Sequence, residues 1–324
     1  MYYSAKLVAA LLIIVCTASA QVTLTSRVNL VFASVEEGTT ILTARDAFTE
    51  RLSEFDRSSR MKTEKAVSPT QLRVFVASQV RPWTAAEIAT ISRIIAPLRA
   101  RLDSMSLPLP DTTYIVKTTG NEEGNAAYTR GPAIVLPQTM IGDDPDALRA
   151  VIIHELFHVM TRNSPALRDR LYKTIGFFPS GEVLLPPSMR HRILTNPDAP
   201  VSEHAILVNL VGKPVWGVPI LYSATESYDT RQKGEFFDYM VFKLLIVDLD
   251  TSGVTPVTRY NTDSPRIVDV SDVTGFFEQI GRNTGYIIHP EEILADNFAM
   301  LVDGYVAARS PEILAKMWAI LRSK

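Results

Sequence analysis

The segment His154-Glu155-Leu156-Phe157-His158 constrains this chain more than any other feature of its sequence. Residues four apart in a helix lie on the same face, so this spacing places two imidazole rings one turn apart. Such a pair fits a tetrahedral zinc ion, which neutral histidines bind at about 2.0–2.1 Å. Glu155 lies beside them, where a carboxylate can take a proton from a water on the metal. We therefore predict that His154 and His158 are metal ligands and that Glu155 is catalytic.

The residues around this segment predict a buried helix over 145–162. Residues 151–153 and 159–160 are apolar, so the helix is apolar nearly all round, which is typical of a core element. Asp143 or Asp144 provides an N-cap, and Pro145 suits the first helical position. Unpartnered histidines and a glutamate in such a helix would destabilise it, and a bound metal removes that cost. The alternative is a pair of core histidines with ordinary hydrogen-bond partners.

The composition is that of an ordinary globular protein. The chain has 324 residues, 46% of them hydrophobic and 21% charged, and its formal net charge is −2. A nucleic-acid-binding surface requires clustered basic residues, and this charge balance gives no sign of them. We therefore expect no nucleic-acid partner.

The first 20 residues have the pattern of a secretory signal peptide. Lys6 precedes an apolar run over 7–16, and Ala18-Ser19-Ala20 forms a small-residue cleavage site before Gln21. The run is too short for a stable membrane span, so no integral span is expected after cleavage. Cys16, the single cysteine, lies within that run, and the mature chain would therefore form no disulfide. An export signal without disulfides favours a secreted or periplasmic bacterial protein.

Periodicity of the apolar residues predicts an α+β chain. We expect an α/β N-terminal part (21–144), the zinc-binding helix (145–165), a β-rich insertion (166–285) and a mainly helical C-terminal part (286–324). Within these parts the sequence predicts strands over 28–34, 72–77, 113–117 and 126–136, helices over 43–57, 84–105, 165–175, 270–280, 290–302 and 310–321, and mostly strands and loops over 177–268.

A third protein ligand is needed, because a hydrolytic zinc site has three and keeps one position open for water. A zinc class with a further histidine shortly after the motif is excluded, since Thr161 and Ser164 occupy the positions of its glycine and histidine. Glu292 and Asp296 share one face of the helix predicted to begin at Pro290. We predict that Glu292 is the third ligand and that Asp296 accepts the remaining N–H of a ligating histidine.

Two alternatives remain open for this acidic segment. Glu291 could replace Glu292 as the ligand. Alternatively, Glu291, Glu292 and Asp296 face solvent and merely complement the positive end of the helix dipole.

This combination of motifs resembles the gluzincin zinc metallopeptidases, the group that includes thermolysin and neprilysin. In neprilysin-like members the third-ligand segment reads Glu-x-x-Ala-Asp, which Glu292-Ile293-Leu294-Ala295-Asp296 matches. The resemblance implies a zincin-like catalytic domain whose mixed sheet has an edge strand before the HExxH helix. It also implies a Zn²⁺ cofactor, a peptide or protein substrate, and hydrolysis by a metal-activated water with Glu155 as general base.

The resemblance extends to a substrate-binding segment. Such enzymes hold the substrate backbone with an Asn-Ala-aromatic segment on the edge strand, and Asn125-Ala126-Ala127-Tyr128 occupies that place, with Ala127 in the aromatic position. The chain also lacks the Gly-x-Met-Glu-Asn segment with which related aminopeptidases bind a free N-terminus, and this favours an endopeptidase.

The chain departs from this family in two respects. The gap between His158 and Glu292 is long, which implies an inserted segment. No histidine follows the third ligand to stabilise the oxyanion; the candidates for that role are Tyr128, Tyr222, Tyr286, His191, His204 and His289, and the sequence does not choose among them. The sequence as a whole predicts an exported zinc peptidase of an unassigned family. The alternatives are an exported binding protein with a structural or degenerate metal site and a chance motif in an unrelated fold.

Overall fold

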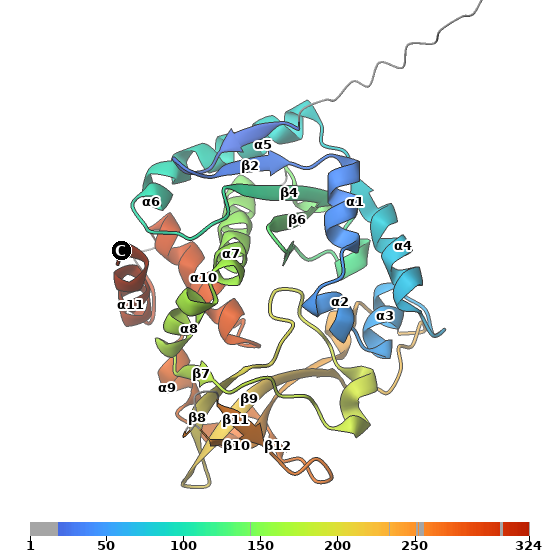
Figure 1. Ribbon diagram of the computed structural model, residues 1–324, viewed down its shortest axis with the longest axis vertical. Coiled ribbons are helices and arrows are strands. Elements are labelled where there is room, and N and C mark those ends of the chain that lie inside the picture. The colour runs from blue at the N-terminus through green and yellow to red at the C-terminus, as the bar shows by residue number, and fades with distance from the viewer. Residues whose placement is uncertain are drawn as a thin grey trace, which may run out of the picture.

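The computed structural model describes residues 19–142, 144–232, 234–250, 252, 256–304 and 307–323. Most of the predicted signal peptide, including Cys16, and the alternative N-cap Asp143 lie outside these residues. Within them the chain is α+β, with eleven α-helices and two separate sheets, a mixed one above and an antiparallel one below in Figure 1. No helix in this part of the chain is long and apolar enough to span a membrane.

The first sheet is mixed and has six strands. Its order is β1-β2-β4-β6-β5, with β3 beside β4; β2, β4 and β6 are parallel, and β1, β3 and β5 pair antiparallel. The strands are β1 (Gln21–Thr23), β2 (Asn29–Phe32), β3 (Val80–Arg81), β4 (Thr112–Thr118), β5 (Tyr128–Arg130) and β6 (Ala133–Pro137). β5 is an edge strand, and β6 lies between it and the HExxH helix in the sequence.

Six short helices connect these strands. They are α1 (Val35–Thr43), α2 (Ala47–Arg51), α3 (Glu54–Arg60), α4 (Pro69–Gln79), α5 (Ala85–Ile95) and α6 (Arg99–Asp103). The long helix predicted over 84–105 is α5 followed by α6, with a 3-10 turn (Ala96–Leu98) at Pro97, where the missing backbone N–H interrupts the α-helix. The helix predicted over 43–57 is divided into α2 and α3, because Ser53 begins a new helix with its own capping box.

The strand predicted over 72–77 is wrong, since these residues belong to α4. The side chain of Ser68 accepts the backbone N–H of Gln71, and Pro69 fills the first helical position. These start signals outweigh the alternation of Leu72, Val74 and Val76, and Val74 is exposed rather than buried.

The second sheet is antiparallel and has seven strands, which confirms that the segment predicted as strands and loops is β-rich. Its order is β11-β10-β9-β8-β13, with β12 beside β10 and β7 beside β8. The strands are β7 (Phe177–Pro179), β8 (His204–Leu210), β9 (Lys213–Ser223), β10 (Met240–Asp250), β11 (Val257–Arg259), β12 (Ile267–Val268) and β13 (Val273–Thr274). The helix predicted over 270–280 is correct only for α9 (Phe276–Ile280), because β13 pairs with β8 before it.

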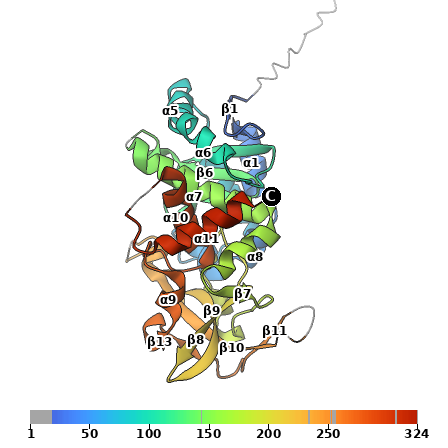
Figure 2. The ribbon, with the colours of Figure 1, turned by 90° about the vertical axis from the view of Figure 1, so that its left-hand side faces the viewer.

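Four further helices complete the fold: α7 (Pro145–Asn163), α8 (Pro165–Lys173), α10 (Pro290–Asp303) and α11 (Pro311–Arg322). α7 and α10 pack side by side, as both ribbon views show (Figures 1 and 2). Ala295 is fully buried at this contact, and the rings of Phe157 and Phe298 meet with centroids 5.7 Å apart. The loop that follows a 3-10 turn (Pro187–Arg192) extends from the β-rich half toward these two helices (Figure 1).

Candidate metal centre

α7 carries the two histidines on one face. The side chain of Asp144 accepts the backbone N–H groups of Asp146 and Ala147 at 3.0 and 3.1 Å, and Pro145 follows at the first position, as the sequence predicts. From this start the helix brings the rings of His154 and His158 to a centroid distance of 4.7 Å.

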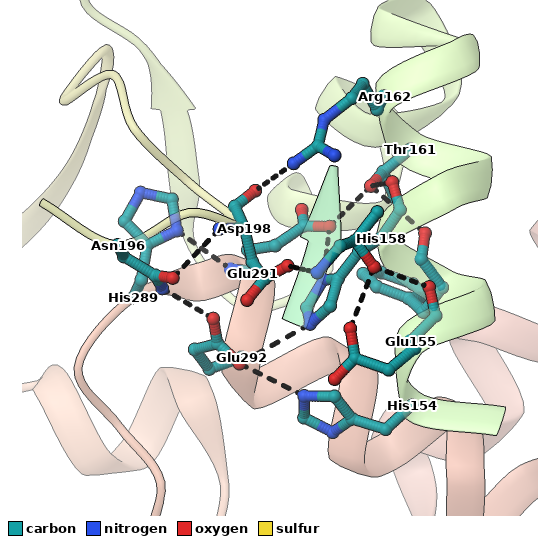
Figure 3. A network of polar contacts seen from close by, with 12 residues as sticks. His154, Glu155, His158, Thr161, Arg162, Asn196, Asp198, His289, Glu291 and Glu292 are labelled. Carbon is teal, nitrogen blue, oxygen red and sulfur yellow. Dashed lines mark hydrogen bonds and ion pairs between the residues drawn. The ribbon is translucent and has the colours of Figure 1, made fainter. Parts of the chain in front are cut away.

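Glu292, in the first turn of α10, lies opposite both rings. Its Oε2 is 3.1 Å from His154 Nε2 and 3.6 Å from His158 Nε2 (Figure 3). A tetrahedral zinc ion with bonds of 2.0–2.1 Å needs ligand atoms about 3.3 Å apart, a separation between these two values. The structure therefore brings His154, His158 and Glu292 together as one group that could hold a metal ion.

The far nitrogen of each ring is bound to a carboxylate. His154 Nδ1 donates to Asp296 Oδ1 at 2.9 Å, and His158 Nδ1 donates to Glu291 Oε1 at 2.9 Å. Both rings therefore present Nε2 toward Glu292, which is how outer hydrogen bonds fix the tautomer of a ligating histidine. Asp296 lies where the sequence predicts it. Glu291, the alternative ligand, instead accepts the hydrogen bond of His158 Nδ1, on the side of the ring away from Glu292.

These carboxylates are themselves held by hydroxyl groups. Thr284 donates to Asp296, whereas Thr161 and Tyr172 donate to Glu291. His289 caps α10 by accepting the backbone N–H of Glu291 at 3.1 Å. The rings and carboxylates are consequently fixed from several elements, and the acidic residues of α10 do not simply face solvent.

The environment of His158 Nε2 indicates whether a metal fits this site. His158 Nε2 is fully buried and has no hydrogen-bond partner within the described part of the chain. A buried polar atom without a partner destabilises a protein by about 1–3 kcal/mol, so such atoms are rare in native structures. A cation between His158 and Glu292 would give this nitrogen a partner. The residues present therefore fit a metal.

The charges around the site also favour a cation. Burial lowers the pKa of His154, but hydrogen bonds to Asp296 and Glu292 outweigh it and raise this pKa to about 10. Burial likewise opposes the charged form of His158, and the nearby carboxylates, Asp198 foremost, raise its pKa well above the usual value. The site therefore stabilises positive charge near its carboxylates, as a divalent cation requires.

Glu155 lies beside the two rings but is not part of the group formed with Glu292. Thr129, on the edge strand β5, donates its hydroxyl to Glu155 Oε2 at 2.8 Å. Burial raises the pKa of Glu155, although the charges of His158 and His154 and the Thr129 hydrogen bond oppose that shift. The carboxylate is thus oriented by one hydroxyl and keeps its other oxygen available for a proton.

Three residues of one loop, Asn196, Pro197 and Asp198, join the site without any signal in the sequence. Asn196 Nδ2 donates to Glu292 Oε1 at 2.6 Å, and Asp198 Oδ1 accepts the Thr129 N–H at 2.7 Å. Arg162 donates to the carbonyl of Pro197 at 2.9 Å. Asn-Pro-Asp is an ordinary turn sequence, and only the folding of the insertion brings it to α7 and α10 (Figure 3).

The two residues predicted to bind substrate lie just before β5. Asn125 is exposed, has a φ of 63°, and accepts a hydrogen bond from Thr139 at 2.7 Å. Ala126 lines a cavity of about 40 Å³ together with Tyr286 and residues of the 196–198 loop. The structure therefore brings Ala126, but not the side chain of Asn125, to the cavity beside β5.

Among the candidates for oxyanion stabilisation, Tyr286 lies next to His154, one of the predicted metal ligands. Its ring is stacked on that of His154, with centroids 6.4 Å apart and planes inclined by 27°. The other candidates have other contacts: Tyr128 donates to Glu122, Tyr222 packs under Arg192, His191 pairs with Glu226, His204 pairs with Asp169, and His289 caps α10.

Comparison with protein-family models, curated proteins and solved structures found no match to this chain.

We predict that Glu292→Ala abolishes tight zinc binding, because it removes a ligand atom. Asp296→Ala and Glu291→Ala should each weaken zinc affinity by about 10–100-fold, since these residues only orient the histidines. Competition titration with a chromophoric zinc chelator measures all three affinities. Glu312→Ala is the control, because Glu312 is an exposed acid in the first turn of α11. Normal affinity in Glu292→Ala would exclude it as the ligand.

Zinc binding should release protons at pH 7. In the metal-free protein His154, with a pKa of about 10, carries a proton at this pH, and zinc binds only the neutral ring. Affinity should therefore rise about tenfold per pH unit for each displaced proton and level off above the pKa. Calorimetry in buffers of different ionisation enthalpy counts the protons. Uptake of zinc without proton release would contradict the assigned histidine environment.

Proposed function

We propose that this protein is an exported zinc-dependent peptidase of the gluzincin type, with a zincin-like catalytic domain. The observation that carries the proposal is the convergence of His154 Nε2, His158 Nε2 and Glu292 Oε2, with Glu155 beside them but outside the ligand group. Three protein ligands and an adjacent carboxylate are typical of a hydrolytic zinc site, whereas structural sites have four ligands and need no base.

The residues of the site support each step of peptide hydrolysis. A zinc ion held here would act as a Lewis acid toward the scissile carbonyl and lower the pKa of a water. Glu155 takes the proton of the attacking water at its available carboxylate oxygen and then gives it to the leaving amine. Thr129 holds the other oxygen of Glu155. Tyr286, stacked on His154, is the residue we assign to donate a hydrogen bond to the developing oxyanion.

The substrate we propose is an extended peptide that pairs with β5. This strand lies at the end of the mixed sheet, and the side chain of its middle residue, Thr129, contacts Glu155. A peptide can add to such an edge as a further strand, with main-chain hydrogen bonds that do not depend on its sequence. Binding along the peptide rather than at its terminus favours an endopeptidase.

A second candidate is an exported binding protein with a structural metal. One observation favours it: Asp198 lies in a group with Glu155 and His158 whose potential ligand atoms are all within 4.8 Å of one another. Asp198 could therefore supply a fourth ligand and close the site. Digestion of casein with and without a chelator separates the two candidates, because only a peptidase gives metal-dependent cleavage.

We predict that Glu155→Gln keeps one equivalent of zinc but lowers hydrolysis at least about 100-fold, because the amide cannot accept the water proton. Casein digestion and elemental analysis of the same preparation measure the two effects. Glu312→Gln, a change at an exposed acid on α11, should leave both unaltered. Retention of most of the activity in Glu155→Gln would remove Glu155 from the mechanism.

A further inference from the structure

We propose that the loop segment 196–198 is a built-in inhibitory segment that occupies the peptide-binding edge of β5. In the structure described above it keeps the enzyme latent, and a peptide must displace it before cleavage. This proposal rests on the proposed peptidase function, whereas the contacts of the 196–198 segment are observed independently of that function.

The segment uses the hydrogen-bonding group that a substrate strand needs. Thr129 is the middle residue of β5, opposite Ile134 of β6, and its N–H donates to Asp198 Oδ1 at 2.7 Å. An edge strand offers its outward N–H groups to an added strand. Thr129 is nevertheless fully buried in this structure. A peptide on β5 therefore competes with Asp198 for the Thr129 N–H.

The same segment reaches the metal-binding residues. Asn196 Nδ2 donates to Glu292 Oε1 at 2.6 Å, on the carboxylate oxygen that faces away from the histidines. Asp198 belongs with Glu155 and His158 to a compact group of potential ligand atoms. The segment thus lies across the side of the site on which Glu155 acts, where a scissile peptide bond has to be placed (Figure 3).

Specific contacts hold the segment in this position. The backbone N–H of Asp198 donates to Asn196 Oδ1 at 2.9 Å, which closes a tight turn around Pro197. Arg162, at the end of α7, donates to the carbonyls of Pro197 and Asp198 at 2.9 and 3.4 Å. The turn is therefore hydrogen-bonded to both α7 and α10.

Thr195, the residue before the segment, is anchored to two buried charged groups. Thr195 donates its hydroxyl to Asp56 at 2.8 Å, and Arg60 donates to the Thr195 carbonyl at 3.2 Å. Asp56 and Arg60 are buried and form an ion pair, and Arg60 also pairs with buried Glu123. Because Thr195 is fixed and the segment itself is held by a few polar contacts, 196–198 can move without unfolding the insertion.

Cavities surround the segment on several sides. It forms part of the walls of three cavities, of about 290, 260 and 40 Å³. Asn196 lines the cavities of 290 and 40 Å³, and Pro197 and Asp198 line those of 260 and 40 Å³. Movement of the segment would remove one wall of the 40 Å³ cavity that Ala126 and Tyr128 line, and so open space beside β5 for an extended peptide.

The test measures peptide binding in the zinc-loaded Glu155→Gln protein, which cannot consume its ligand. The probe is fluorescein-labelled oxidised insulin B chain, and fluorescence anisotropy gives its Kd. Asp198→Ala should lower this Kd at least about tenfold, because it removes a charge-assisted hydrogen bond that competes with the probe. Asn196→Ala should also lower the Kd. Asp263→Ala, a change at an exposed aspartate of the insertion, is the matched control.

Hydrogen exchange supplies a second readout that requires neither metal nor activity. In Asp198→Ala the Thr129 amide should exchange faster, and saturating insulin B chain should restore its protection. Asp198→Asn keeps the side-chain volume and should give a Kd between those of the protein with Asp198 and the Asp198→Ala variant. It replaces the alanine variant in the test if that variant fails to fold. A Kd that is unchanged or raised, or loss of zinc in Asp198→Ala, would overturn the proposal.

The outcomes separate this inference from the peptidase proposal. Zinc binding and Glu155-dependent cleavage with an unchanged Kd in Asp198→Ala would overturn the inhibitory segment and leave the peptidase. Tighter binding and peptide-restored protection in a protein that takes up no zinc would support the segment and overturn the peptidase.

Discussion

The structure depends on the burial of His158 between two carboxylates of α10. Glu291 holds its Nδ1 from behind, and Glu292 lies 3.6 Å from its Nε2. His158 has no exposed side-chain surface, and each glutamate side chain is only 2% exposed. Such charges are stable inside a protein only when they are paired or coordinate a metal. This requirement fixes the register of α7 against α10, because a shift of either helix would leave a buried charge without its partner.

The same contact determines where the rest of the molecule can lie. The mixed sheet packs on α7 and places Thr129 beside Glu155. The antiparallel sheet begins after α8, and its loop that contains Asp198 packs against Thr129. The two halves share one apolar core, which includes Ile134 of the mixed sheet and Ile206 of the antiparallel sheet, and the polar residues of α7 and α10 lie next to it. A site of this kind suits chemistry on a bound ligand, since its polar groups are held in place before the ligand arrives.

Local signals in the sequence predict much of this arrangement. Asp144, Pro145 and the apolar residues around the motif predict α7, and the spacing of Glu292 and Asp296 predicts two acids on one face of α10. The strand predicted over 72–77 fails because the cap at Ser68 outweighs the β-branched pattern. The roles of Asn196 and Asp198 could not be predicted, because they arise from long-range packing of a loop whose own sequence specifies only a turn. The role of Glu291 could not be predicted either, because the choice between Glu291 and Glu292 as the ligand depends on the exact orientation of α10.

Anomalous diffraction at the zinc edge from crystals of the zinc-loaded protein would locate the ion relative to His154, His158 and Glu292. We expect one strong peak, about 2.0–2.2 Å from His154 Nε2, His158 Nε2 and a carboxylate oxygen of Glu292, with Glu291 and Asp296 still bound to the histidine Nδ1 atoms. An ion elsewhere, or a protein that takes up no zinc while the two histidines keep their positions, would contradict the assignment of these three ligands.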